Sequence, residues 1–190
     1  MRNSARLVNL GLLVFVQVLC IDVVAAPTAA PVASPMRTVE NLDLPRYMGT
    51  WYEIARFPNR FQRNCAGFTK ADYRAQPDGS VEVTNQCREV DGRIDVAVGQ
   101  ARQIGGTGAA TLEVRFAPAW LSFLPMVWGD YWIIDLDPAY SLAAVSEPER
   151  QYLWILSRNA KPDASAYRAL LERLRRNGLD TDRLVLTRQQ

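Results

Sequence analysis

Between Thr50 and Arg158 the chain alternates apolar and polar residues with a period of two, and short turn signals interrupt the alternation at regular intervals. This pattern is typical of β-strands that turn one face to a core and the other to water. No helical periodicity intervenes, so neighbouring strands are expected to pair directly and antiparallel. The pattern predicts eight strands, at residues 50–57, 67–75, 80–88, 93–102, 110–117, 130–136, 140–146 and 151–158.

One helix is predicted after these strands. Asp163 is a suitable N-cap, and Asn177-Gly178 is a typical helix end. Between them one apolar stripe recurs at helical spacing, formed by Tyr167, Leu170, Leu171 and Leu174. We expect this stripe to pack on the outside of the strands, and a last short strand at 183–187 to join the sheet edge.

Regular short strands without intervening helices indicate an all-β fold, either an antiparallel sandwich or a barrel, with the C-terminal α-helix packed outside. A barrel of eight strands is wide enough either for side chains alone or for one small ligand. Several residues that are candidates for the inner face are small, which favours a cavity inside the barrel. Larger side chains from the opposite wall could fill this space instead. These candidates are Ala71, Ala75, Ala97, Gly99 and Ala101.

The first 39 residues have a different composition. Residues 1–25 combine basic residues, an apolar stretch and small residues before a cut, which is typical of a secretory signal peptide rather than of a membrane anchor. Residues 26–39 form a Pro/Ala-rich linker, and residues 40–190 form the folded domain. We expect an exported protein, periplasmic or extracellular, with association with the outer membrane left open. A lipid anchor at Cys20 is not expected, because the residue before it is bulky.

Two cysteines, Cys65 and Cys87, remain in the exported part of the chain and flank a predicted hairpin turn at Pro77-Asp78-Gly79. In an exported protein, such a pair favours one disulfide. The alternative is a pair of free or metal-binding thiols, which would lack histidine or further cysteine nearby.

Composition weighs against catalysis and against several partners. The sequence holds no histidine, which removes Ser-His-Asp and Cys-His arrangements and most zinc sites. Its formal charge is +2 without a basic run, so no nucleic-acid partner is expected. No metal or cofactor is expected either. Asp135 and Asp137 could form an acid pair, but we expect Asp137 to open the turn at Pro138.

Three short motifs occur in the order and spacing of the lipocalin signatures. They are Gly49-Thr50-Trp51, Leu136-Asp137-Pro138-Ala139-Tyr140 and Ser157-Arg158. Over residues 40–188 the chain resembles the lipocalins, and within them the bacterial outer-membrane lipocalins and their relative apolipoprotein D. It departs from them where Leu136 replaces a threonine and where the lipidation motif is degenerate at Cys20.

The resemblance implies an eight-stranded antiparallel up-and-down β-barrel with one C-terminal α-helix packed outside. It also implies that this barrel binds, stores or transports a fatty acid, lysophospholipid or similar lipid for the cell envelope. It also implies a closed end formed by Gly49, Trp51 and Arg158, with the guanidinium on the indole face. We expect the lipid head near the mouth, held by Tyr73, Tyr131 or an arginine. Strand parity predicts the residues that line the ligand, with the parity of 93–102, 130–136 and 151–158 left open. They are Ala55, Phe57, Ala71, Tyr73, Val83, Asn85, Leu112, Val114, Phe116, Tyr131, Ile133 and Trp154.

The connection at 117–128 is strongly apolar, which is unusual for a loop. Three interpretations stay open: the loop is buried over the barrel mouth, it is a lip that touches lipid or a partner as a peripheral membrane contact, or it is a lid that gates the interior. The residues concerned are Trp120, Leu121, Phe123, Leu124, Met126 and Trp128.

The favoured partner is therefore a small hydrophobic ligand, bound by a monomer or weak homodimer. One alternative is an enzyme on the same barrel that acts on a lipid through Tyr73, Glu53 or a cysteine. Another is a tetrapyrrole or haem carrier, which would need a tyrosine or methionine ligand. A membrane-spanning barrel would need an apolar outer face, whereas charged residues such as Lys70, Asp72 and Arg74 are predicted there.

Overall fold

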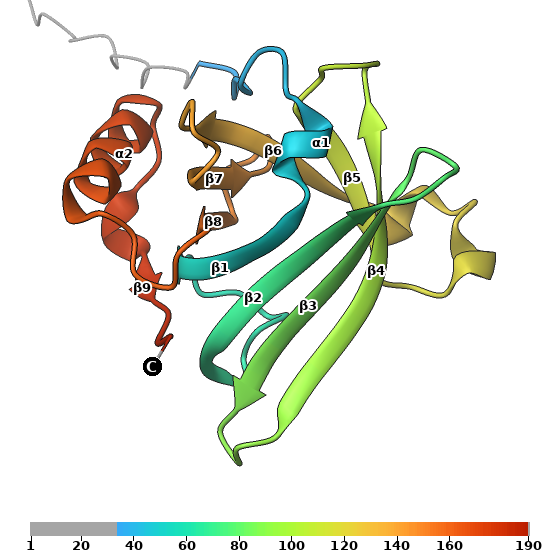
Figure 1. The fold of residues 1–190 in the computed structure, drawn as a ribbon, viewed down its shortest axis with the longest axis horizontal. Coiled ribbons are helices and arrows are strands. Elements are labelled where there is room, and N and C mark those ends of the chain that lie inside the picture. The colour runs from blue at the N-terminus through green and yellow to red at the C-terminus, as the bar shows by residue number, and fades with distance from the viewer. Residues whose placement is uncertain (1–33, 190) are drawn as a thin grey trace, which may run out of the picture. The chain divides into compact units, whose positions relative to one another are not determined.

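The computed structural model describes residues 34–189 (Figure 1). The predicted signal peptide and the first part of the predicted linker lie outside the described residues. The end of that linker contacts the folded domain, since the amide of Val39 donates to the carbonyl of Ile133 at 2.9 Å. Within residues 34–189, no helix has the length and apolar character needed to cross a membrane.

The described residues form nine strands and two α-helices, with three short 3-10 helices between them. The strands are β1 (Gly49–Arg56), β2 (Cys65–Ala75), β3 (Val81–Glu89), β4 (Ile94–Ile104), β5 (Thr111–Arg115), β6 (Gly129–Leu136), β7 (Leu142–Ser146), β8 (Leu153–Ser157) and β9 (Val185–Leu186). The helices are α1 (Leu44–Tyr47), α2 (Ala164–Arg176), η1 (Ala119–Leu121), η2 (Pro125–Val127) and η3 (Thr181–Arg183).

The sheet closes on itself. Strands β2 to β8 pair in sequence order, β8 pairs with β1, and β1 pairs with β2. All the pairings are antiparallel, as the period-two pattern and the short turns require. The eight-stranded barrel is therefore confirmed, with β9 as an additional strand.

Strand β9 fills a gap in the wall. Strands β1 and β2 pair only from Gly49 to Tyr52, and β9 then pairs with β1 at Ala55 and Arg56. The residues after β9 continue between the two strands. The side-chain amide of Gln189 donates to the carbonyls of Glu53 and Thr69, at 2.6 and 2.7 Å. The predicted last strand thus bridges β1 and β2 in the half of the barrel where they diverge.

Helix α2 packs on the outside of the barrel, as expected. Its N-cap Asp163 accepts a hydrogen bond from the amide of Ala166 at 2.8 Å. Leu170 and Leu174 are fully buried and join an apolar cluster with residues of β1, β7 and β8. Arg173 adds a bidentate ion pair to Asp135 of β6, with N–O distances of 2.7 and 2.8 Å. Asp135 therefore anchors the helix.

Asp137 holds the turn between β6 and β7. Its carboxylate accepts the amides of Ser141 and Leu142, both at 2.6 Å. Burial opposes ionisation of this carboxyl, but these backbone hydrogen bonds outweigh it and hold its pKa below the ordinary value. Because Asp137 bonds to the turn and Asp135 to α2, the two carboxylates do not act as a pair.

A β-bulge corrects part of the predicted inner face. The register between β1 and β8 shifts between Glu53 and Ala55, so that β1 carries an extra residue there. Beyond the bulge Ala55 and Phe57 turn outward and pack in the cluster with Leu170 and Leu174. The prediction that Ala55 and Phe57 line the interior is therefore wrong. A simple period of two cannot detect one inserted residue, which moves every later side chain to the other face.

Cys65 and Cys87 form the expected disulfide, which joins the start of β2 to the end of β3. The bridge closes a loop with a sequence separation of 22, which constrains the unfolded chain.

Replacing both cysteines with alanine is expected to lower the free energy of unfolding by about 3 kcal/mol in urea titrations. The parent protein titrated with reductant should approach the same value, and the variant should not respond to reductant. A loss below about 1 kcal/mol would contradict the expected constraint.

Candidate ligand-binding site

One end of the barrel is closed by Trp51 and Arg158. Trp51 is fully buried on the inner face of β1, and its indole N–H donates to the carbonyl of Tyr47 at 2.8 Å. The guanidinium carbon of Arg158 lies 4.0 Å from the Trp51 ring centroid. This is the stacked geometry in which an arginine and an aromatic face attract each other.

Arg158 also binds the backbone around the end of α1. Its guanidinium donates to the carbonyls of Thr50 at 2.8 Å, Arg46 at 2.9 Å and Met48 at 2.7 Å. Gly49 has a φ of +95°, and a Cβ at this position would lie only 3.2 Å from the guanidinium. The glycine therefore permits both the turn into β1 and the close approach of Arg158.

Three tyrosines lie just inside this closed end. The hydroxyl of Tyr131 is 2.9 Å from that of Tyr47 and 2.8 Å from that of Tyr73. The ring of Tyr47 also packs against Trp51, with 4.9 Å between centroids. The expectation that Tyr73 and Tyr131 hold a lipid head near the mouth is therefore wrong. Tyr73 pairs with Gly49 at the base, because β2 runs from the mouth to the closed end.

Burial keeps these phenols protonated. Removal from water raises the pKa of Tyr73 to about 12, against a weaker opposing effect of its hydrogen bond to Tyr131. Burial is also the main reason that the pKa values of Tyr47 and Tyr131 rise well above 10. At neutral pH all three are uncharged groups that donate and accept hydrogen bonds.

Tyr47 was not identified from the sequence. It lies on α1, a helix of one turn that starts at the N-cap Asp43 and carries a proline in its first positions. The Asp-Leu-Pro run at 43–45 is a recognised helix start and was the available signal.

The inner wall continues from the closed end towards the mouth. Eight of the predicted lining residues pack in one cluster with Trp51 and Tyr47; they are Ala71, Tyr73, Val83, Leu112, Val114, Tyr131, Ile133 and Trp154. The small residues Ala71 and Ala101 are buried there. In this half of the barrel, large aromatic side chains thus cover the small residues.

Nearer the mouth, the residues predicted to line the inner wall are more exposed to solvent. Asn85 is half-buried and Ala97, its partner on β4, is exposed. Phe116 is exposed as well and lies against Gly99, where a Cβ would approach its ring to 2.7 Å. Glycine at this position therefore lets the phenylalanine ring lie directly on β4.

A polar network joins the β1–β2 loop to the inner wall. Glu53, 3% exposed, shares the Trp51 face and binds Arg56 at 2.9 Å and the side-chain amide of Gln62 at 2.5 Å. The amide oxygen of Gln62 in turn accepts the indole N–H of Trp154 at 2.9 Å. Glu53, a candidate for the enzyme alternative, is thus engaged in an ion pair and in positioning the loop.

The apolar connection between β5 and β6 is open to solvent. Trp120, Phe123 and Met126 are 72%, 74% and 86% exposed, so the interpretation of a loop buried over the mouth is wrong for these three. Leu121 and Leu124 are half-buried. The ring of Trp128 packs against the guanidinium of Arg102, with 4.1 Å between the guanidinium carbon and the ring centroid. Its indole N–H donates to the carbonyl of Ser122.

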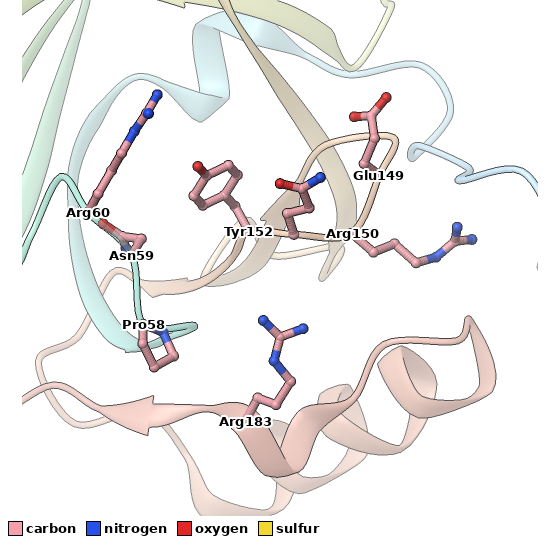
Figure 2. A pocket seen from close by; sticks show the side chains of 8 residues that line it. Pro58, Asn59, Arg60, Glu149, Arg150, Tyr152 and Arg183 are labelled. Atoms are coloured by element: carbon pink, nitrogen blue, oxygen red, sulfur yellow. The ribbon is translucent and has the colours of Figure 1, made fainter.

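A groove of about 430 Å³ lies between the β1–β2 and β7–β8 loops and next to η3 (Figure 2). Figure 2 shows the guanidinium of Arg183 pointing into this space. The groove is lined mainly by polar residues, and none of the predicted lining residues belongs to it; the lining is Pro58, Asn59, Arg60, Glu149, Arg150, Gln151, Tyr152 and Arg183. It is therefore distinct from the predicted lipid site.

A closed eight-stranded barrel, an external C-terminal helix and an arginine stacked on the tryptophan of the first strand together define a lipocalin. The chain matches the family model described as a lipocalin-like domain over residues 42–189, and it belongs to this family.

Individual relatives agree with this assignment. The chain is 40% identical to temperature-induced lipocalin-1 of Arabidopsis thaliana, over 81% of this chain and 83% of the relative. It is 36% identical to outer membrane lipoprotein Blc of Escherichia coli K12, over 89% and 97%, and 31% identical to apolipoprotein D of Mus musculus, over 79% and 78%. Insecticyanin of the tobacco hornworm Manduca sexta has a similar fold, with a TM-score of 0.64, 16% identity, and coverage of 83% and 86%.

Proposed function

We propose that this lipocalin binds and carries a fatty acid, lysophospholipid or similar lipid inside its barrel, in a role in cell-envelope lipid handling. The observation that carries the proposal is an inner wall that is closed by Trp51 and Arg158 at one end and has apolar residues open to solvent at the other. Family membership supports hydrophobic ligand binding in general, and relatives named as outer membrane lipoproteins support an envelope role.

The binding energy would come from the tail. Each buried methylene contributes about 0.8 kcal/mol, so ten methylenes contribute about 8 kcal/mol before ordering costs. That is sufficient for affinity in the micromolar range when those costs are small. Since Tyr73 and Tyr131 lie at the base, an arginine is what remains of the groups that the sequence predicts to hold the lipid head.

The proposal is tested by native mass spectrometry of the purified protein, which would reveal a co-purified lipid, and by titration with a fluorescent fatty acid. Phe116→Asp places a charge on the inner wall near the mouth, and we expect it to weaken fatty-acid binding about tenfold, because it removes apolar contact area. Phe123→Asp makes the same change on the exposed loop and is the matched control. Failure of the parent protein to bind any lipid would refute the proposal. A Soret band on haem titration would favour the tetrapyrrole alternative instead.

The exposed loop gives a separate expectation. We propose that Trp120 and Phe123 insert at a lipid surface, because aromatic side chains favour the interface between water and acyl chains. Replacing both with serine should reduce co-sedimentation with liposomes several-fold and leave fatty-acid affinity unchanged. An equal loss of both activities would assign the loop the role of a lid. Arg74→Ala, a change at a well-exposed side chain on β2, serves as the control.

A further inference from the structure

Strand β4 has a free edge over half of its length. It pairs with β3 from Ile94 to Ala101, but with β5 only from Gln100 to Ile104. Strand β5 ends at Arg115, and the chain then leaves the sheet for the apolar loop (Figure 1). Among residues 34–189, no strand pairs with the outer edge of residues 94–98.

The hydrogen-bond alternation shows which backbone groups point to this edge. The amide of Glu89 donates to the carbonyl of Arg93 at 2.8 Å, so these two residues form a hydrogen-bonded pair. In an antiparallel ladder such pairs alternate, and the odd-numbered residues of β4 therefore bond to β3. The amides and carbonyls of Ile94, Val96 and Val98 consequently point to the free edge.

The side chains do not protect this edge. Ile94, Val96 and Val98 are 55%, 51% and 60% exposed, and Asp95 is the one charged residue within 94–98. Stable proteins usually shield such edges with lysines, prolines, bulges or a covering segment, because an unpaired apolar strand pairs readily with another strand. This edge is therefore suited to strand addition.

We propose that the β4 edge pairs antiparallel with β4 of a second copy of this chain, across a twofold axis at Val96. Val96 then faces Val96 of the other copy, Ile94 faces Val98, and Asp95 faces Ala97. The three pairs of edge-facing residues supply about six backbone hydrogen bonds. The interface is small, so it forms a weak dimer.

Two neighbouring registers are less favourable. An axis at Asp95 places two carboxylates directly opposite each other, which destabilises a strand pair. An axis at Ala97 requires the backbone of Gln100, which already pairs with Arg115 of β5. The axis at Val96 uses every free backbone group of the edge and opposes no like charges.

A second strand fits this edge better than a lipid surface does. Acyl chains offer no hydrogen-bond partners for backbone amides and carbonyls. Burying one such group in hydrocarbon without a partner costs on the order of several kcal/mol. A strand from an identical copy satisfies them and covers the exposed valines at the same time.

The first test is the variant Val96→Pro. Proline removes the amide that points to the free edge and leaves the β3 ladder intact, and edge strands tolerate it. We expect the dimer dissociation constant, measured by sedimentation equilibrium over a concentration series, to rise at least about tenfold through the loss of two hydrogen bonds. Val96→Thr keeps the amide and the shape of the side chain, and it should leave dimerisation nearly unchanged.

The second test is covalent and does not depend on the proline variant folding. Opposed residues in a hydrogen-bonded pair have Cα atoms about 5.5 Å apart, which a disulfide spans. Val96→Cys should therefore form a covalent dimer on mild oxidation. Thr84→Cys, on the neighbouring strand opposite Val98, should not. The unsubstituted chain reports any dimer formed through Cys20.

A monomer at every concentration would overturn the proposal, as would a dimer that both cysteine variants trap equally. A monomer whose binding to phosphatidylglycerol vesicles is lost in Val96→Pro would also overturn it and would assign the edge to a membrane contact.

Discussion

Replacing Trp51 with alanine is expected to lower the free energy of unfolding by about 4 kcal/mol, as measured by urea titration with circular dichroism. Trp51 is fully buried, and its removal leaves a cavity beside Tyr47 and removes the surface on which Arg158 lies. The substitution affects two elements at once, because this ring joins the base of β1 to Tyr47 of α1.

Arg158→Ala should cost about 1–3 kcal/mol, because the stacking contact is lost and several carbonyls around α1 lose their donor. Since Trp51 and Arg158 are in contact, the double variant should lose less than the sum of the two single losses. Arg74→Ala, at an exposed ion pair, should change stability by less than about 1 kcal/mol. An unchanged thermal midpoint for Arg158→Ala would show that the assignment of the closed end is wrong.

The second large effect is a loss of stability in alkali. The folded protein holds the pKa of Tyr73 at about 12, whereas an unfolded tyrosine titrates near 10. The protonated form is thus favoured by folding, so its contribution is complete below pH 10 and is lost as the pH rises through 12. Tyr73 alone accounts for about 3 kcal/mol, and the raised pKa values of Tyr47 and Tyr131 act in the same direction.

The measurement combines tyrosinate absorbance with stability at each pH. We expect tyrosinate from these three residues to appear only together with unfolding, and Tyr73→Phe to reduce the alkaline loss relative to the parent protein. Tyr152→Phe, a change at a half-buried ring near the mouth, is the matched control. Ionisation of all tyrosines near pH 10 in a folded protein would contradict the burial of the cluster.

The barrel itself could be predicted from the sequence because it depends on local signals. Period-two alternation set the number of strands, and the cap at Asp163 set the start of α2. The bulge after Glu53 could not be predicted, since it depends on how β1 pairs with β8, more than 100 residues later.

The candidate site was less predictable for a similar reason. Parity assigns a side chain to a face of the sheet but not to a depth in the barrel, and so Tyr73 and Tyr131 were expected at the wrong end. The contact of Gln62 with Glu53 and Trp154 combines a loop with two strands, and no spacing in the sequence encodes it. The exposed aromatic loop, by contrast, was visible from composition alone.

The gap in the barrel wall that β9 fills has a consequence for the kinetics of folding. Gln189 bonds to Glu53 and Thr69, which precede it in the chain by 136 and 120 positions. This part of the wall therefore depends on contacts between residues that are far apart in the sequence. Contacts of high sequence separation form late, because the loop entropy must be overcome before they contribute. Most of the sheet can therefore assemble while this gap remains beside β1, and we expect the gap to close late in folding.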